Sequence, residues 1–457
     1  MSTAAKADKH PKGLYVLFAT EMWERFSFYS MLAMFTLYLR DDTGQGFGWS
    51  SDAATGLYAN YLMFVYLSPL IGGWLADRKL GYRRAVMIGG LFFMAGHLLL
   101  SFRSIPIVYV ALACLVIGNG LFKPNVSTLV GNLYPDGSHL KDRAYNIFYM
   151  GINVGAFLAP VVAEFVQSKF GFHPAFAVAA GGMAISVFIM WKFKRHLEVA
   201  ESSSLVDARQ AADSAAVAVD APPAGVSSQD ELNTGRRERM EAVPEWKRIG
   251  ALIVIYCIVI VFWMVFHQNG STMTYWANEN TDWQVTGIIS NSINPGWVIL
   301  LTFPLVWFWG WLDRKGLEPS TPTKMAFGMM LTGLAFLILY FGAKSGEATV
   351  VGDDPYAFKV SAAWLIGAYG VLTLGELMLS PMGLSLVSKV APVRFRGVMM
   401  GGWFLATAIG NKLTQIGALW DDWLHSTFWL LLSGCAVFMA IVLLLLLKPL
   451  KKAMPGV

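Results

Sequence analysis

The sequence has little charge and little cysteine. Only 14% of its 457 residues are Asp, Glu, Lys or Arg, whereas about 25% are charged in an average soluble domain. The 3 Cys residues are an odd number within apolar runs, so no disulfide framework is expected. No HExxH motif is present, and the histidines are far apart in the sequence, so neither zinc ligands nor a nucleophile–base set is evident. These absences exclude a soluble multidomain protein and argue against an enzyme.

Apolar residues are abundant instead. Hydrophobic residues make up 55% of the chain, with 17 Trp and 30 Phe. A bilayer core needs about 20 helical residues to cross it, and a helix satisfies its own backbone in lipid. Twelve segments have this length, at residues 14–39, 53–76, 84–102, 105–132, 143–168, 174–194, 248–276, 287–311, 324–343, 360–387, 395–419 and 424–448. We therefore predict an all-α polytopic membrane protein with twelve transmembrane helices.

Basic residues mark one side of the membrane. With twelve spans, both termini and alternate loops share one side, where 27 of the 35 Lys and Arg residues fall. The opposite loops contain 5, and 3 lie inside spans. Because cytoplasmic loops carry the excess of Lys and Arg, we expect a protein integral to the plasma (inner) membrane, with both termini in the cytoplasm.

A polar tract divides the spans into two groups of six. Residues 198–245 contain SSS, APPAG and GRRERM, which is typical of a flexible cytoplasmic linker. We expect a six-helix bundle over residues 1–197, the linker over 198–245 and a second six-helix bundle over 246–457. The polar linker predicts that no additional membrane helices lie between the two bundles.

The two halves also repeat a loop motif. Residues 73–81 read GWLADRKLG after the second span, and residues 310–316 read GWLDRKG after the eighth. Many short basic loops contain Gly and Arg, but the shared order at equivalent positions indicates a repeat. Parallel six-span repeats are typical of the major facilitator superfamily, whose loop motif the longer first copy, GGWLADRKLGYRR at 72–84, resembles. The resemblance implies that Asp77 and Arg78 form a conformational latch.

The first span contains three charged residues. Glu21, Glu24 and Arg25 are spaced i, i+3, i+4, which places them on one helical face. A charge at mid-bilayer costs at least about 2.5 kcal/mol on insertion scales, so each marks a functional-site hypothesis. One Arg neutralises one Glu, and the second carboxylate becomes a candidate proton carrier. The alternative is a structural ion-pair cluster that holds this span to its neighbours.

Three other spans contain ionisable residues near their middle. Lys123 precedes Pro124, which is expected to bend the span; alternatively Lys123 snorkels to an interface. His267 is either functional or a packed histidine. A cavity with Arg25 and Lys123 on one wall and Glu376 on another suits a carboxylate and an ammonium. The residues alone therefore predict a transporter of a small zwitterion.

Five motifs resemble those of the proton-coupled oligopeptide transporter (POT/PTR) family. They are EMWERF at 21–26, GNGLFKPNVST around Lys123, FYMGINVGA at 148–156, NPGW at 294–297 and GELMLSPMGLS around Glu376. ExxER alone is unspecific, but five motifs in order on the expected spans are specific. The resemblance implies uptake of di- and tripeptides by rocker-switch alternating access, with protons as the coupling ion and no cofactor or metal.

The resemblance also implies roles for individual positions, with Glu376 holding the peptide N-terminus. The residues expected to take part in proton coupling are Glu21, Glu24, Arg25, Lys123, His267 and Glu376. The residues expected to bind substrate are Arg25, Tyr29, Tyr66, Lys123, Asn153, Asn294, Glu376 and Trp403.

The sequence departs from the family pattern in span 7 and in span 1. Where the family has a Glu paired to the Lys of span 4, this chain has His267. We hypothesise that His267 and Lys123 are coupled and that protonation of His267 drives them apart. In span 1, the family usually has an aromatic pair after ExxERFS, and in Phe28–Tyr29 one of the hydroxyl groups is missing. Leu32 stands where many members have Arg. The loss of this charge is expected to alter peptide selectivity or the number of protons transported.

Two alternatives within transport stay open. A related transporter would move another small anion or zwitterion, such as nitrate or a peptide-like compound, although Glu376 favours a ligand with an ammonium group. A channel fits the composition, but two half-repeats with opposed charges favour rocking around a central site. The expected partners are di- and tripeptides and the lipid bilayer, without nucleic acid, and we expect a monomer.

Overall fold

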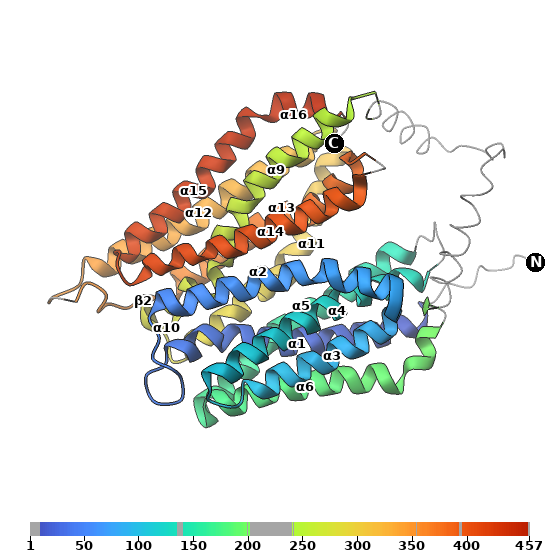
Figure 1. The fold of residues 1–457 in the computed structure, drawn as a ribbon. Coiled ribbons are helices and arrows are strands. Elements are labelled where there is room, and N and C mark those ends of the chain that lie inside the picture. The colour runs from blue at the N-terminus through green and yellow to red at the C-terminus, as the bar shows by residue number, and fades with distance from the viewer. Residues whose placement is uncertain are drawn as a thin grey trace, which may run out of the picture. The chain divides into compact units, whose positions relative to one another are not determined.

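The computed structural model describes residues 10–134, 140–198, 200–201, 240, 242–352, 354–392 and 395–455, which are mostly helical (Figure 1). The all-α prediction is confirmed. The predicted linker falls largely on residues 202–239, which lie outside the described residues. The long helices are α1 (Lys12–Arg40), α2 (Ser51–Leu75), α3 (Tyr82–Leu99), α4 (Ile105–Asn132), α5 (Leu140–Phe170), α6 (Phe172–Lys192), α9 (Glu245–Phe266), α11 (Ile293–Arg314), α12 (Thr321–Glu347), α13 (Ala362–Val390), α14 (Arg396–Leu413) and α15 (His425–Leu445).

Short elements connect or extend these helices. They are η1 (Ala76–Leu80), η2 (Lys194–Leu197), η3 (His267–Gly270), α10 (Thr272–Glu279), η4 (Gly287–Ser292), η6 (Thr414–Trp420) and α16 (Leu447–Ala453). Strands β1 (Thr281–Asp282) and β2 (Val360–Ser361) form one short parallel pair. Gly81 links η1 to α3 with φ 74°, a left-handed backbone conformation that favours glycine.

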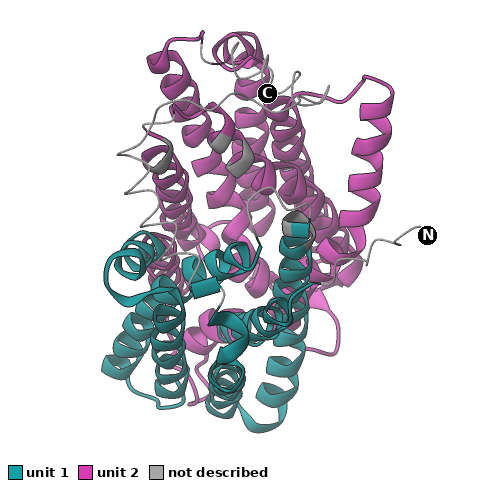
Figure 2. Cartoon of the chain, turned by 90° about the vertical axis from the view of Figure 1, so that its right-hand side faces the viewer, with its two compact units in different colours: residues 1–31, 68–220 teal, residues 32–67, 221–457 magenta. Residues whose placement is uncertain are grey.

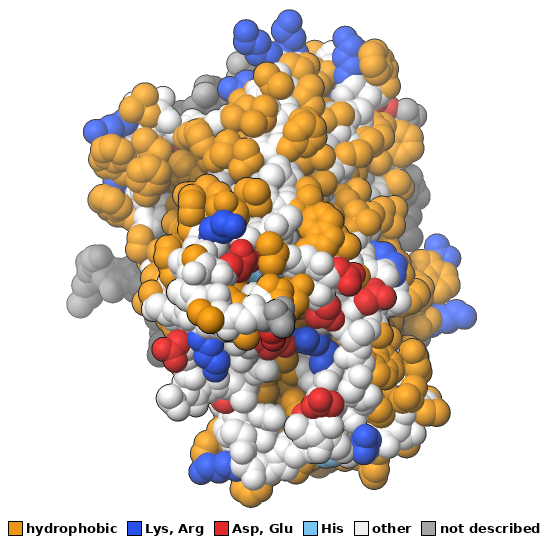
Figure 3. Space-filling model, turned by 90° about the vertical axis from the view of Figure 1, so that its left-hand side faces the viewer, with side chains coloured by type: hydrophobic (Ala, Val, Ile, Leu, Met, Phe, Trp, Pro, Cys, Tyr) orange, Lys and Arg blue, Asp and Glu red, His pale blue; other side chains and the backbone are white. Residues whose placement is uncertain are grey.

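The helices have the composition of membrane spans. Within the described residues, nine helical segments are long and apolar enough to cross a membrane by length and composition. Large side chains on α11 are exposed, including Phe303 (65%) and Trp307 (66%). Hydrophobic side chains also cover broad areas of the face drawn in Figure 3. Contiguous apolar surface of this kind marks contact with lipid or a partner, and together with helix length it indicates an integral membrane protein.

The chain forms two compact units that each combine separate segments (Figure 2). Unit 1 comprises residues 1–31 and 68–220, and unit 2 comprises residues 32–67 and 221–457. The boundaries fall within α1 and α2, so each of these helices contributes one part to each unit.

Unit 1 is held together by close helix packing. Helix α3 packs against α4 and α6, and α5 packs against α6. A Cβ atom on Gly89 of α3 would lie 2.8 Å from the carbonyl oxygen of Gly118 in α4. The two backbones therefore approach as closely as small residues permit in membrane helices. Phe93 fills the adjacent core and contacts the rings of Phe28 and Phe122 at 6.5 and 6.3 Å between centroids.

Unit 2 follows the same packing principle. Helix α12 packs against α13 and α15, and α9 packs against α14; α12, α13 and α15 are labelled in Figure 1. A Cβ atom on Gly328 of α12 would lie 2.7 Å from the carbonyl oxygen of Gly375 in α13. Because Gly375 precedes Glu376, this close approach fixes the backbone next to a predicted site residue.

Candidate functional site

The charged face of α1 forms an ion-pair cluster inside unit 1. Arg25 donates from Nη2 to Glu24 Oε1 at 2.6 Å and from Nε to the other oxygen of the same carboxylate. Its Nε also lies 3.2 Å from Glu21 Oε1. The three residues are 0 to 3% exposed. Glu24 is therefore paired with Arg25 through two charge-assisted bonds, the geometry that binds most strongly.

Glu21 is less completely paired than Glu24. Its Oε2 atom is buried and has no hydrogen-bond partner among the described residues. A buried carboxylate oxygen without a donor carries an uncompensated desolvation penalty. The expectation that one of the two carboxylates lacks a full partner therefore agrees with the geometry, and Glu21 is that residue.

Lys123 lies on α4 in the same unit. It interacts electrostatically with Glu21, Glu24 and Arg25. Pro124 lies inside the continuous helix and removes one backbone donor there. Nearby, Asn125 donates from Nδ2 to the carbonyl oxygen of Leu121 at 2.7 Å. The helix thus holds a cation within electrostatic reach of Glu21, Glu24 and Arg25, and the role of this cation in proton coupling and substrate binding stays a prediction.

Helix α5 approaches α1 closely beside Arg25. A Cβ atom on Gly155 would lie 2.3 Å from the carbonyl oxygen of Met22 and 3.1 Å from Cβ of Arg25. This close packing explains why the second glycine of FYMGINVGA, Gly155, has no side chain. Asn153 is 8% exposed and donates from Nδ2 to the carbonyl oxygen of Tyr149 at 2.9 Å, so this donor is used within its own helix.

Tyr29 lies one turn after Arg25 on α1. Its ring contacts Phe28 edge-to-face, with 5.2 Å between centroids, and the guanidinium of Arg25 lies 5.1 Å from the Phe28 centroid. Tyr29 also interacts electrostatically with Arg25. Four of the predicted residues of α1 therefore form one continuous cluster.

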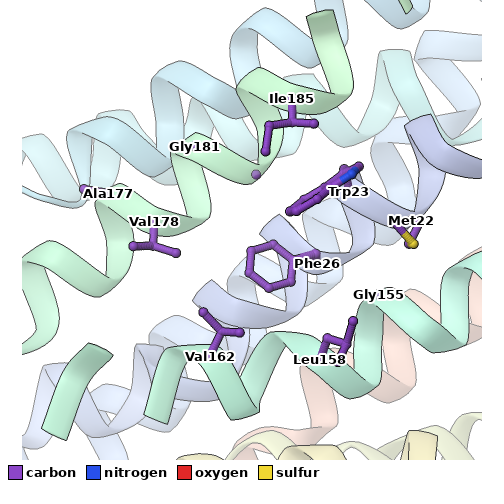
Figure 4. A pocket seen from close by; sticks show the side chains of 11 residues that line it. Met22, Trp23, Phe26, Gly155, Leu158, Val162, Ala177, Val178, Gly181 and Ile185 are labelled. Carbon is purple, nitrogen blue, oxygen red and sulfur yellow. The ribbon is translucent and has the colours of Figure 1, made fainter. Parts of the chain in front are cut away.

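An apolar groove lies on the other face of α1 (Figure 4). It has a volume of about 690 Å³, and Trp23, Phe26, Leu158, Val178 and Ile185 line it with other apolar residues of α1, α5 and α6. At 100° per residue, these α1 positions point away from the acidic cluster. Among the described residues, no charged side chain lines the groove, so it is not the site for a zwitterion that the sequence predicted.

The predicted span 248–276 is interrupted in unit 2. Helix α9 ends at Phe266, the tight turn η3 covers His267–Gly270, and α10 begins at Thr272. The side chain of Gln268 donates to the carbonyl oxygens of Met264 and Thr414 at 3.3 and 3.1 Å. Inserted side-chain bonds of this kind break or kink helices, and the polar HQNG sequence favours the break.

His267 lies at this break in an aromatic enclosure. It is 9% exposed. Its ring stacks on Trp263 at 5.2 Å between centroids and meets Tyr66 edge-to-face at 5.9 Å. Two predicted site residues, His267 and Tyr66, are therefore in contact within unit 2.

Glu376 and Asn294 form a second pair of predicted residues in unit 2. Asn294 Nδ2 donates to Glu376 Oε2 at 2.9 Å and to Thr373 Oγ1 at 2.9 Å. Glu376 is partly exposed. The amide orients the carboxylate by a charge-assisted bond, which leaves the other oxygen available for a cation. This geometry suits recognition of an ammonium group.

Trp403 is buried in unit 2, at 3% exposure. Its ring meets Tyr256 edge-to-face at 6.4 Å, and a Cβ atom on Gly383 would lie 1.8 Å from the Trp403 ring. The residue packs tightly between α9, α13 and α14 in this conformation, so its predicted contact with substrate stays a prediction.

The predicted latch residues are exposed in η1, directly after α2. Asp77 accepts a hydrogen bond from the hydroxyl of Tyr82, the first residue of α3. The guanidinium of Arg78 lies 5.4 Å from the Trp74 ring centroid. Both residues make local contacts, and their latch function stays a prediction.

One charged contact was missed by sequence reasoning. Arg40, at the end of α1, donates from Nη1 to Glu279 Oε1 at 2.6 Å and lies 3.7 Å from Asp421. Its guanidinium also lies 4.2 Å from the Tyr275 ring centroid. The available signal was an Arg at a span end and acidic residues at the ends of two later spans.

The fold and these buried charges define an integral membrane protein with an ionisable interior. Residues 83–420 match the family model PTR2, the POT family. The chain belongs to the POT family, and it is therefore a transporter and not an enzyme. The resemblance that the five motifs indicated is confirmed.

Individual relatives cover nearly the whole chain. The "Uncharacterized transporter YclF" of Bacillus subtilis (strain 168) is 32% identical over 98% of this chain and 96% of its own length. A "Di-/tripeptide transporter" of Lactococcus lactis subsp. lactis (strain IL1403) is 30% identical over 98% and 97%. A crystal structure of the peptide transporter POT in complex with sulfate superposes with a TM-score of 0.82 at 29% identity, over 99% of this chain and 97% of that one.

Proposed function

We propose that this chain is a proton-coupled symporter that imports di- and tripeptides by rocker-switch alternating access. The observation that carries the proposal is the cluster on α1, where Glu24 is bound by Arg25 and a buried oxygen of Glu21 has no partner among the described residues. A proton on Glu21 removes a charge that burial disfavours. The relative named a di-/tripeptide transporter supports the choice of substrate.

We propose twelve spans in two six-helix bundles, without extra membrane helices between them. Among the described residues, nine helical segments meet apolar criteria, and α1, α3 and α14, with 29, 18 and 18 residues, supply the remaining three. The distribution of Lys and Arg supports cytoplasmic termini.

The site divides the roles by charge. Arg25 and Lys123 receive the peptide carboxylate, and Glu376, oriented by Asn294, receives the peptide ammonium. Protonation of the carboxylate cluster together with bound peptide favours the inward-open state, because both changes reduce uncompensated charge in the interior. Protons are the coupling ion, and no cofactor takes part. The protein acts as a monomer in this proposal.

The central test is reconstituted uptake of a dipeptide with and without an inward proton gradient. We expect accumulation against the peptide gradient with the wild type. We expect Glu24→Gln and Lys123→Ala to lose it. A variant of either kind that still concentrates peptide in liposomes contradicts the assignment.

His267 stands where the family has a Glu, and we assign it a role in the proton step. We propose that neutral His267 and Lys123 are coupled and that a proton on His267 repels Lys123, since like charges in a low dielectric repel strongly. His267→Gln should then retain peptide exchange and lose proton-driven counterflow. Full proton-driven counterflow in this variant contradicts the coupling.

A second candidate substrate is another small anion or zwitterion, such as nitrate or a peptide-like compound. A POT family transporter that is 25% identical, with a TM-score of 0.81, was crystallised in complex with 5-aminolevulinic acid. Competition against the uptake of labelled dialanine separates the candidates. If the chain is a peptide transporter, other peptides should compete best. Stronger competition by nitrate or by an amino keto acid favours the alternative.

A further inference from the structure

A basic pocket lies at one end of unit 1, apart from the ion-pair cluster. It has a volume of about 280 Å³, and it lies where α3 begins and the antiparallel α6 ends. Three of its lining residues are basic, and four are apolar: Arg83, Arg84, Lys194, Met87, Ile88, Met190 and Trp191. Arg83 and Arg84 end the loop motif at residues 72–84, but the predicted latch residues are Asp77 and Arg78, and no residue of the pocket belongs to the proposed transport site.

The positive charge of the pocket is only partly neutralised. Arg83 donates from Nε to Glu201 Oε2 at 2.8 Å. Arg84 and Lys194 are exposed, and neither forms an ion pair with another described residue. One carboxylate against three basic groups leaves a local excess of two positive charges. The pocket is therefore complementary to an anion.

The other lining residues of the pocket are apolar. Met190 is 1% exposed, whereas Trp191 is 59% exposed. Met87 and Ile88 follow the arginines by one turn of α3, so the charged and apolar groups share one helix face. An exposed Trp at the end of a span is typical of the membrane interface, where its ring lies at headgroup level.

We propose that this pocket binds an anionic phospholipid. Arg84 and Lys194, with the remaining donors of Arg83, bind the headgroup phosphate, and an acyl chain lies along Met87, Ile88 and Trp191. Basic pockets between membrane helices on the cytoplasmic side bind anionic headgroups in other proteins. A free phosphate ion would satisfy the cations but leave the apolar wall uncovered, so the lipid is the better occupant.

The chain offers a matched control for this proposal. Lys192 and Arg195 flank Lys194 and are exposed at the same end of α6, but neither lines the pocket. A double variant Arg84→Gln, Lys194→Gln and a double variant Lys192→Gln, Arg195→Gln therefore remove equal charge from the same surface. General attraction to an anionic membrane affects both pairs equally, whereas a built site affects only the first.

The test is native mass spectrometry of the full chain titrated with phosphatidylglycerol, with phosphatidylcholine of the same acyl chains as the neutral probe. Each charge-assisted hydrogen bond to a bound phosphate contributes about tenfold in affinity. We expect the pocket variant to lose about 100-fold in affinity for phosphatidylglycerol and the control variant to lose less than threefold. Phosphatidylcholine should bind both equally.

Three outcomes would overturn the proposal. They are equal loss in the two double variants, undiminished binding in the pocket variant, and displacement of phosphatidylglycerol by millimolar inorganic phosphate, which would indicate a simple anion site. Trp191→Ala tests the apolar wall. This variant should bind long-chain phosphatidylglycerol more weakly, whereas its affinity for the short-chain dihexanoyl form should be unchanged. Dipeptide uptake in phosphatidylcholine liposomes checks that every variant is folded.

Discussion

Glu21 and Glu24 should respond differently to neutralisation, although they lie three residues apart on one helix. Glu24 accepts two bonds from Arg25, one of them at 2.6 Å. Removing one partner of a buried ion pair costs about 3–5 kcal/mol, because the other charge stays buried. Glu21 makes one contact with Arg25 at 3.2 Å, and Arg25 keeps Glu24 when Glu21 is lost. We expect about 1 kcal/mol for Glu21→Gln.

The same geometry predicts how the two variants should behave in transport and in thermal unfolding. Glu21→Gln should be stable and exchange peptide across the membrane, but it should not concentrate peptide when a proton gradient is applied, because the titrating carboxylate is gone. Glu24→Gln should also unfold at a clearly lower temperature. Thermal unfolding in detergent, counterflow and gradient-driven uptake in proteoliposomes measure the three properties on the same preparations.

Two results would refute this reasoning. Equal thermal destabilisation by Glu21→Gln and Glu24→Gln would show that the pairing with Arg25 is not selective. Gradient-driven accumulation by Glu21→Gln would show that another group carries the proton. Reduced expression alone refutes neither, because counterflow is normalised to the amount of folded protein.

Two further predictions concern unit 2 and unit 1. Asn294→Ala removes the amide that donates to Glu376 at 2.9 Å, a loss of about 1.4 kcal/mol, so the KM for a dipeptide should rise about tenfold. Asn291→Ala, one turn away, should change the KM less than twofold. Equal KM values for the two variants would contradict the role of Asn294 in orienting Glu376. Gly72→Ala should prevent stable folding, because its Cβ would lie 1.9 Å from a backbone carbonyl oxygen of α4. The neighbouring Gly73→Ala should be tolerated, because its Cβ would lie 3.7 Å from the nearest atom. Equal yields of folded protein would contradict the close packing of α2 against α4.

Hydropathy predicted the helices well because lipid requires each span to satisfy its own backbone. It did not predict where spans break. The segment 248–276 is apolar from Ile249 to Phe266, and the polar HQNG sequence that follows favours a break there. Gln268 also donates to the carbonyl oxygen of Thr414. That partner is distant in the sequence, so the local pattern does not reveal the contact that holds the break.

The site was predicted in parts for a similar reason. The spacing of Glu21, Glu24 and Arg25 placed them on one face, and i, i+4 geometry is a local property. The preference of Arg25 for Glu24 depends on rotamers and on the close approach of α5 at Gly155. The burial of Trp403 likewise depends on a tertiary contact that no motif encodes.

Arg40 lies at the end of α1, in the part of the helix that belongs to unit 2, together with its acidic partner Glu279. Arg40 pairs with Glu279 at 2.6 Å with side chains 20% and 36% exposed, so a double-mutant cycle with Arg40→Gln and Glu279→Gln should give a coupling of about 0.5–1 kcal/mol in unfolding free energy.

A matched cycle with Lys344→Gln and Glu347→Gln should give none, because that pair is 4.0 Å apart and Lys344 is 62% exposed. Equal couplings in the two cycles would reduce the Arg40 contact to an ordinary surface pair. A coupling confined to the Arg40 cycle shows that this contact stabilises the folded protein, because its side chains are less exposed to solvent screening than Lys344.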